Sequence, residues 1–117
     1  MTSNLDLVLA YHRAWTSGDV DGAMAYVADD VVCHAPGRDL SGKEGYRAFL
    51  AGFAPNLTRV TDIAQFAEAG DRVALFYYPE TAATSSAPAA ECFTLRDGVI
   101  AANVLIFDRL SFGPPSA

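Results

Sequence analysis

The sequence predicts an α+β fold in which three helices come first and most of a sheet follows. Up to Pro55, apolar residues recur at the three- and four-residue spacing of amphipathic helices. From Leu57 onward that period disappears, and strand-like segments are separated by short turn signals. Helices that precede the strands, rather than alternating with them, are typical of an α+β domain.

The first two predicted helices are adjacent. One begins after the capping-box-like segment Ser3–Asp6 and ends at Gly18. Asp19 is expected to cap a second, shorter helix, which Asp29 and Asp30 end. The residues at helical spacing in this region are Leu5, Val8, Leu9, His12, Trp15, Ala23, Met24 and Val27.

A short strand is predicted between the second and third helices. The β-branched pair Val31–Val32 opens it, and it closes at Ala35 before a Pro-Gly turn. The capping box Ser41–Glu44 begins the third helix, which Pro55 ends. Its apolar stripe is the most regular in the chain and consists of Tyr46, Phe49, Leu50 and Phe53.

Four strands are predicted over residues 57–67, 72–79, 89–96 and 99–108. Gly70-Asp71 and Asp97-Gly98 are short hairpin signals, so these segments form an antiparallel meander. One curved sheet packed against three helices can enclose a space between the two layers.

Composition and charge exclude several classes of protein. The 117 residues, 51% of them hydrophobic, suit one domain over 1–117, with a core at 5–108 and a tail at 109–117. Eight basic and fourteen acidic residues give a net charge of -6, which disfavours nucleic-acid binding. The first residues lack the pattern of a secretory signal, and no apolar run is long enough for a membrane span. We therefore expect no nucleic-acid or membrane partner, and a cytoplasmic location.

The cysteines and histidines do not form a recognisable metal-binding pattern. Cys33 and Cys92 lie far apart without a CxxC motif, and the two histidines are scattered. We expect no metal and no cofactor.

Strand alternation predicts which side chains face the enclosed space. Glu91, Phe93 and Leu95 share one face of their strand, and Asn103, Leu105 and Phe107 share one face of the next. If both faces point inward, Glu91 and Asn103 lie among large apolar groups, where an ionisable side chain has a perturbed pKa. The alternative is that Glu91 points to solvent at the rim.

The same parity places Tyr77 inside and leaves an apolar outer face. Its members are Phe76, Tyr78, Val104 and Ile106. A monomer would rarely leave such a patch in water, so we expect a homodimer formed through this face.

Four stretches together resemble the NTF2-like superfamily. They read Gly18-Asp-Val-Asp-Gly22, Ala28-Asp-Asp-Val31, Ser41-Gly-Lys-Glu-Gly-Tyr-Arg-Ala-Phe49 and Asp97-Gly-Val-Ile100. His34-Ala-Pro-Gly37 followed by Ser41-Gly42 is most similar to the SnoaL-like branch. The resemblance implies a cone-shaped α+β barrel, with three helices packed on a curved, mostly antiparallel sheet around an apolar pocket. It also implies dimers through the outer sheet face, but it does not specify a reaction.

Comparison with the ketosteroid isomerases of this superfamily gives a mixed result. Their oxyanion-hole tyrosine falls on Tyr11, and their second, carboxylic donor falls on Glu91 two residues before Phe93. Their proton-shuttling aspartate falls on Ala35, so the usual base is missing. The resemblance implies an aspartate and a histidine for SnoaL-type cyclases, and no inward aspartate is evident in the last two strands.

His34 is the natural candidate for the base, because an imidazole exchanges protons near neutral pH. Ungapped strand register turns Cys33 and Ala35 inward and His34 outward, whereas a bulge at Pro36 would reverse this. His12 is the second candidate, either in the pocket or on the surface.

The sequence therefore leaves two hypotheses. One is a cofactor-independent pocket for a small apolar molecule with an oxygen function, with isomerase, cyclase or hydratase chemistry carried by Tyr11, His34 and Glu91. The other is a non-catalytic ligand-binding or protein-interaction module. The residues expected to bind the substrate are Trp15, Phe49, Phe53, Tyr77, Phe93, Asn103, Leu105 and Phe107.

Overall fold

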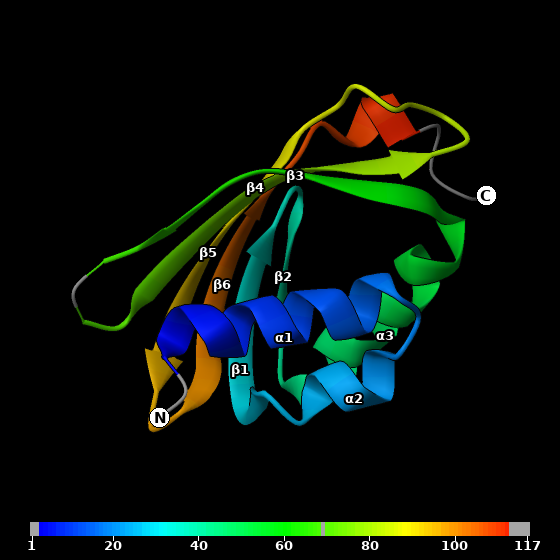
Figure 1. The fold of residues 1–117 in the computed structure, drawn as a ribbon. Helices are drawn as coiled ribbons and strands as arrows, with labels where there is room; N and C mark the ends of the chain where they lie inside the picture. Colours follow the sequence, from blue (N-terminus) through cyan, green and yellow to red (C-terminus); the bar gives the residue numbers. More distant parts are fainter. Residues whose placement is uncertain (1–2, 69, 113–117) are drawn as a thin grey trace.

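The computed structural model describes residues 3–68 and 70–112. Three α-helices, six strands and two 3₁₀ turns follow one another in this part of the chain (Figure 1). In order they are α1 (Asn4–Thr16), α2 (Val20–Met24), β1 (Val27–Ala35), β2 (Arg38–Ser41), α3 (Lys43–Phe53), η1 (Ala54–Asn56), β3 (Leu57–Ala67), β4 (Arg72–Thr81), β5 (Ala89–Arg96), β6 (Val99–Ile106) and η2 (Arg109–Phe112).

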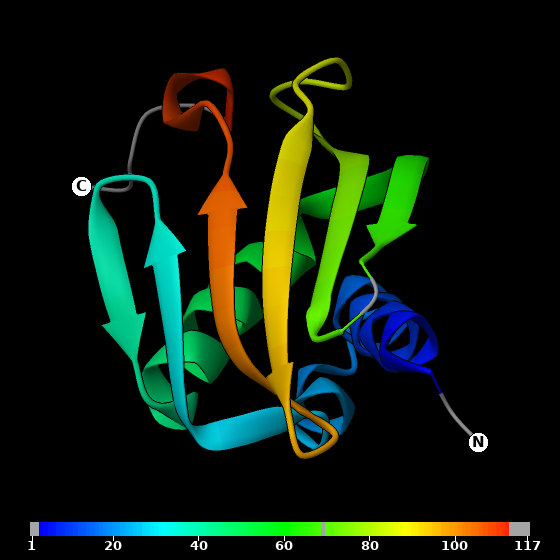
Figure 2. The same cartoon turned by 90° about the vertical axis from the view of Figure 1, so that its left-hand side faces the viewer.

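The strands form one curved, open sheet with the order β2-β1-β6-β5-β4-β3, seen from its outer side in Figure 2. All neighbours are antiparallel except β1 and β6, which run parallel. The helices lie on the inner side of the sheet (Figure 1). The predicted α+β class and mostly antiparallel sheet are confirmed, and the four C-terminal strands lie close to their expected bounds.

Three local predictions on the N-terminal side are wrong. Val27 does not continue the second helix but starts β1, where it is buried and pairs with Ile100. Residues 38–41 form the unexpected strand β2, in which Ser41 pairs with Val32. Gly42, rather than Ser41, is therefore the N-cap of α3, and its φ of 88° lies in the left-handed region that glycine tolerates.

The predicted caps of the first two helices are confirmed. The Ser3 hydroxyl accepts a hydrogen bond from the Asp6 amide, and the Asp19 carboxylate accepts one from the Gly22 amide. Asp97 and Gly98 both have positive φ, as a tight hairpin turn between β5 and β6 requires.

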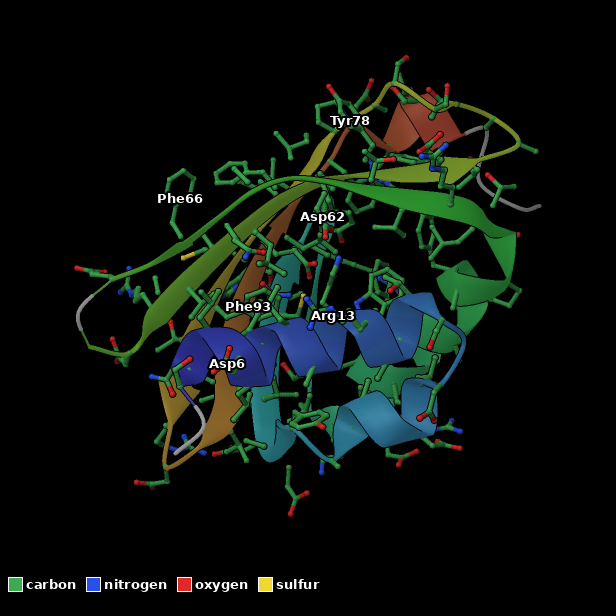
Figure 3. The ribbon with its side chains drawn as sticks, viewed as in Figure 1. Asp6, Arg13, Asp62, Phe66, Tyr78 and Phe93 are labelled. Atoms are coloured by element: carbon green, nitrogen blue, oxygen red, sulfur yellow. The ribbon has the colours of Figure 1, made fainter. Side chains whose placement is uncertain are left out.

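Strand β3 contains an irregularity between Asp62 and Ala64 that reverses its facing. Asp62 pairs with the inward-facing Tyr77, whereas Ala64 pairs with the outward-facing Phe76. Residue 63 is therefore the extra residue of a bulge. As a result, Asp62 lies between the sheet and α1, whereas Phe66 lies on the outer face of the sheet, away from the helices (Figure 3).

The buried core fills the space between the helices and the inner face of the sheet. The outer face carries the apolar side chains predicted from parity, with Phe76, Val104 and Ile106 exposed and Tyr78 half-buried. Phe66 extends this surface, because its ring packs edge-to-face against Phe76. Within residues 3–68 and 70–112, no helix has the length and apolar character needed to cross a membrane.

Candidate functional site

An apolar pocket lies between α1, α3 and the inner face of strands β4, β5 and β6. Its volume of about 30 Å³ is roughly room for one or two water molecules. Phe112 of η2 helps to close the pocket, since its ring contacts two other lining residues, Phe53 and Phe107, edge-to-face. The lining residues are Trp15, Phe49, Leu50, Phe53, Tyr77, Pro79, Ala89, Glu91, Leu105, Phe107 and Phe112.

Glu91 is the one carboxyl group among these lining residues, and it is 3% exposed. Its Oε1 accepts a hydrogen bond from the Asn103 amide nitrogen at 2.8 Å, and its Oε2 accepts one from the Tyr77 hydroxyl at 2.8 Å. Burial raises the pKa of Glu91, although the His12 imidazole and these two hydrogen bonds act in the opposite direction. Glu91 therefore faces inward, as strand alternation predicts, and not toward solvent at the rim.

Behind Glu91, a chain of hydrogen bonds continues into the core. The Asn103 amide nitrogen also donates to the Tyr46 hydroxyl at 3.1 Å, and the hydroxyls of Tyr46 and Tyr11 are hydrogen-bonded to each other. Burial raises the pKa of both phenols well above the usual value. Tyr11 and Tyr46 therefore stay protonated and act as neutral hydrogen-bonding groups.

Several buried polar atoms around Glu91 have no hydrogen-bond partner within the described part of the chain. They are both ring nitrogens of His12, the indole nitrogen of Trp15 and the amide oxygen of Asn103. An unsatisfied buried polar atom costs roughly 1–3 kcal/mol, so such atoms are typical of sites that bind water or a ligand.

His34 lies outside the pocket. Its side chain is exposed, and its Nδ1 lies 2.9 Å from Asp39 Oδ1 in the β1–β2 hairpin. No bulge reverses the strand at Pro36, because residues 32–35 pair continuously with β2. His34 consequently shares the outer face with Val104, its cross-strand partner. The structure does not bring this candidate base to Glu91.

The remaining predicted site residues fall into two groups. Trp15, Phe49, Phe53, Tyr77, Glu91, Leu105 and Phe107 line the pocket together. Tyr11, Phe93 and Asn103 are fully buried behind that lining. Within the described residues, the hydrogen bonds that connect Tyr11 to Glu91 run through Tyr46 and Asn103.

Leu50, Pro79 and Ala89 line the pocket but are absent from the predicted substrate-binding residues. Three further residues of the site show why the sequence prediction was incomplete. Phe112 lies in the segment expected to be a tail, where no periodicity marks its facing. Asp62 was hidden by the bulge in β3, because simple alternation does not reveal where the strand reverses. Tyr46 belongs to a regular helical stripe, and nothing in that stripe distinguishes a hydroxyl that joins a network.

Among residues 3–68 and 70–112, no group of three or more histidine, cysteine, aspartate or glutamate side chains is arranged to hold a metal ion. The polar side of the pocket consists instead of one carboxyl group, one phenol and one indole nitrogen.

Comparison with known proteins identifies the family. Residues 8–103 match the profile of the SnoaL-like domain. The chain is 43% identical to a protein of known crystal structure from Kribbella flavida DSM 17836, with a TM-score of 0.89 and coverage of 96% of this chain and 92% of that one. A search of curated proteins finds no match.

Two further solved structures share the fold. A putative polyketide cyclase from Pseudomonas putida KT2440 is 23% identical, with a TM-score of 0.79 and 96% of each chain covered. The protein TerC, crystallised with polyporic acid, is also 23% identical, with a TM-score of 0.73 and coverage of 93% of this chain and 94% of TerC. Since the profile covers most of the chain, the protein belongs to the SnoaL-like domain family, within the NTF2-like superfamily.

Proposed function

We propose that this protein binds a small, largely apolar molecule with an oxygen function in the pocket around Glu91. We further propose that it catalyses an isomerase-, cyclase- or hydratase-type reaction without a cofactor. The observation that carries the proposal is the buried carboxyl group of Glu91, held by Tyr77 and Asn103 in an otherwise apolar lining. An ionisable group retained in such a place is a candidate for chemistry.

The raised pKa of Glu91 favours a neutral carboxylic acid, which is able to donate a hydrogen bond. A donor of this kind stabilises negative charge that develops on a ligand oxygen, and its effect is large where water is excluded. The unpartnered indole nitrogen of Trp15 is a second donor in the same lining. The ligand therefore needs an oxygen acceptor such as a ketone, an enolate or a phenolate.

The walls of the pocket favour a flat, unsaturated ligand. They include five aromatic side chains besides Tyr77, namely Trp15, Phe49, Phe53, Phe107 and Phe112. A ligand of several rings exceeds the present volume of about 30 Å³, so binding requires Phe112 and neighbouring rings to move apart. The similarity to TerC and to putative polyketide cyclases supports the same ligand class.

The second candidate is a binding module without catalysis. Two points favour it: the resemblance to ketosteroid isomerases implies that Ala35 replaces their base, and the structure places His34 on the outer face. A buried acid and an indole donor would then only orient a ligand. The cytoplasmic location expected from the sequence stays a prediction under either candidate.

A binding and turnover screen separates these candidates. 2-Naphthol is the binding probe, since it is flat and carries a single oxygen, and its fluorescence reports its surroundings. Enones, steroids and aromatic polyketides form the turnover panel. We expect Glu91→Gln to weaken naphthol binding and abolish any turnover, whereas Glu44→Gln, an exposed carboxylate on α3, changes neither. Binding without turnover of any panel member favours the module, and absence of binding contradicts both candidates.

A further inference from the structure

A second pair of ionisable groups lies next to Glu91. His12 of α1 is buried, and its Nε2 lies 3.5 Å from Asp62 Oδ1 on β3. The His12 ring packs edge-to-face on Tyr77, with ring centroids 4.6 Å apart. Because the Tyr77 hydroxyl binds Glu91, the His12 imidazole, the phenol and the buried carboxyl group form one contiguous cluster.

Asp62 connects this cluster to solvent. Its side chain is 63% exposed, whereas the His12 side chain is only 4% exposed. The bulge after Asp62 leaves the carboxylate on the inner face opposite Tyr77, toward α1 (Figure 3). The cluster thus extends from the solvent edge of the sheet to the pocket.

The charged and titratable groups around His12 come from three strands. Asp62 approaches from β3, Tyr77 from β4 and Glu91 from β5. On α1 itself, Arg13 is exposed and follows His12 in sequence. Neither His12 ring nitrogen has a hydrogen-bond partner within residues 3–68 and 70–112, so no hydrogen bond of the described chain fixes which nitrogen carries the ring proton.

We propose that His12 is the proton partner of Glu91 and that Asp62 is a positioning residue that stabilises the His12 imidazolium. The structure shows no hydrogen bond between His12 and Glu91, whose oxygens are bound by Tyr77 and Asn103, so a water molecule must carry the proton between them. The Glu91 carboxyl group gives its proton to this water, and the water gives one to a ring nitrogen of His12, which leaves a carboxylate, an imidazolium and an unchanged water. The reverse transfer restores both groups. This assignment rests on the proposed function for the use of Glu91, and it gives the pocket a base that does not depend on His34.

If His12 and Asp62 act in this way, replacing either one shifts the Glu91 titration in a defined direction, which a purely structural role would not predict. A protonated His12 favours the Glu91 carboxylate, so His12→Gln moves the Glu91 titration to higher pH. Asp62→Asn makes the His12 imidazolium less stable and therefore also moves the Glu91 titration to higher pH. A direct effect of Asp62 on Glu91 has the opposite sign, because removing a nearby negative charge favours another carboxylate.

Infrared spectroscopy of the intact, ligand-free protein tests this directly. The carbonyl band of the protonated Glu91 side chain is identified by its loss in Glu91→Gln and is followed against pH. We expect its midpoint to rise by about one pH unit in His12→Gln, the size of effect of one charge a few ångströms away. Asp62→Asn raises it by less, and in a His12→Gln background Asp62→Asn no longer raises it.

The second histidine–aspartate pair of the chain provides the control. Asp39→Asn removes the carboxylate beside the exposed His34 and leaves the Glu91 midpoint unchanged. The inference is overturned if His12→Gln leaves the midpoint in place, or if Asp62→Asn lowers it. Where His12→Gln does not fold, the sign of the Asp62→Asn shift still decides. The infrared experiment uses no ligand. Its outcome therefore does not depend on whether the protein binds naphthol, and the two proposals can fail separately.

Discussion

The amide nitrogen of Asn103 lies 2.8 Å from Glu91 Oε1, along a diagonal of the β5–β6 pair. The direct cross-strand partner of Glu91 is Leu105, and that of Asn103 is Phe93. A diagonal contact of this kind lets the same amide also reach Tyr46 on α3. One side chain of the sheet therefore joins the pocket carboxyl group to the helical layer.

Glu91 makes stability depend on pH. Its folded-state pKa is raised above the usual 4.5, so the folded protein retains a proton that the unfolded chain has released. Its favourable contribution is complete below the unfolded pKa and is lost as pH rises through the folded pKa. Urea unfolding of wild type and Glu91→Gln across pH should show wild type losing stability relative to the variant as pH rises. A difference that stays constant with pH contradicts this.

Tyr46→Phe should destabilise the fold more than Tyr11→Phe. The Tyr46 hydroxyl contacts both Tyr11 and Asn103, so its loss leaves two buried polar groups without that partner. The expected cost is about 1–3 kcal/mol in the free energy of unfolding, whereas Tyr11→Phe removes one contact and should cost about 1 kcal/mol. Chemical denaturation measures both values, and equal costs would argue against Tyr46 as the centre of the network.

Phe112→Ala should open the pocket. This half-buried ring packs on Phe53 and Phe107, so its removal should strengthen or speed naphthol binding while lowering stability by about 1 kcal/mol. Leu110→Ala is the matched control, since Leu110 lies in the same turn but is 82% exposed. Stopped-flow fluorescence measures the association rate, and identical rates for wild type and Phe112→Ala would mean that this ring does not limit entry.

We propose that two copies pair through the outer face of the sheet. Phe66, Phe76, Val104 and Ile106 all lie exposed there. Burying this apolar surface on both chains should give a mass twice the 12.4 kDa of one chain by light scattering. Phe76→Glu should yield monomers, while Leu110→Glu, outside the sheet, should not. Monomeric wild type at micromolar concentration would refute the proposal.

The two thiols should differ sharply in reactivity. Cys33 is fully buried, and burial raises its pKa to about 12, so almost no thiolate is present at neutral pH. Cys92 is half-buried and pairs with Val104, whose side chain is exposed on the outer face. A chromogenic disulfide reagent should label Cys92 first, and Cys92→Ala should remove the fast phase. Slower labelling at higher protein concentration would agree with pairing through that face.

The sequence was most informative where each element obeys a single period. Parity in β5 and β6 identified Glu91 and Asn103 as inward, and alternation in β4 did the same for Tyr77. It could not predict Asp62, because one inserted residue reverses the facing of β3. Nor could it rank His12 above His34, since that choice depends on which strand of the sheet covers α1. Side-chain networks depend on such tertiary neighbours, whereas strand facing is a local property.

The extra residue at position 63 determines the facing of two side chains of β3 that lie on opposite sides of the sheet. It keeps Asp62 on the side of His12 and, four residues later, leaves Phe66 beside Phe76 on the opposite side. Deleting one residue there would shift the phase of one half of β3 while leaving its composition almost unchanged. Either Asp62 would lose its place beside His12, or Phe66 would turn inward. Among related sequences, the spacing between these two positions should therefore vary less than their amino-acid identities.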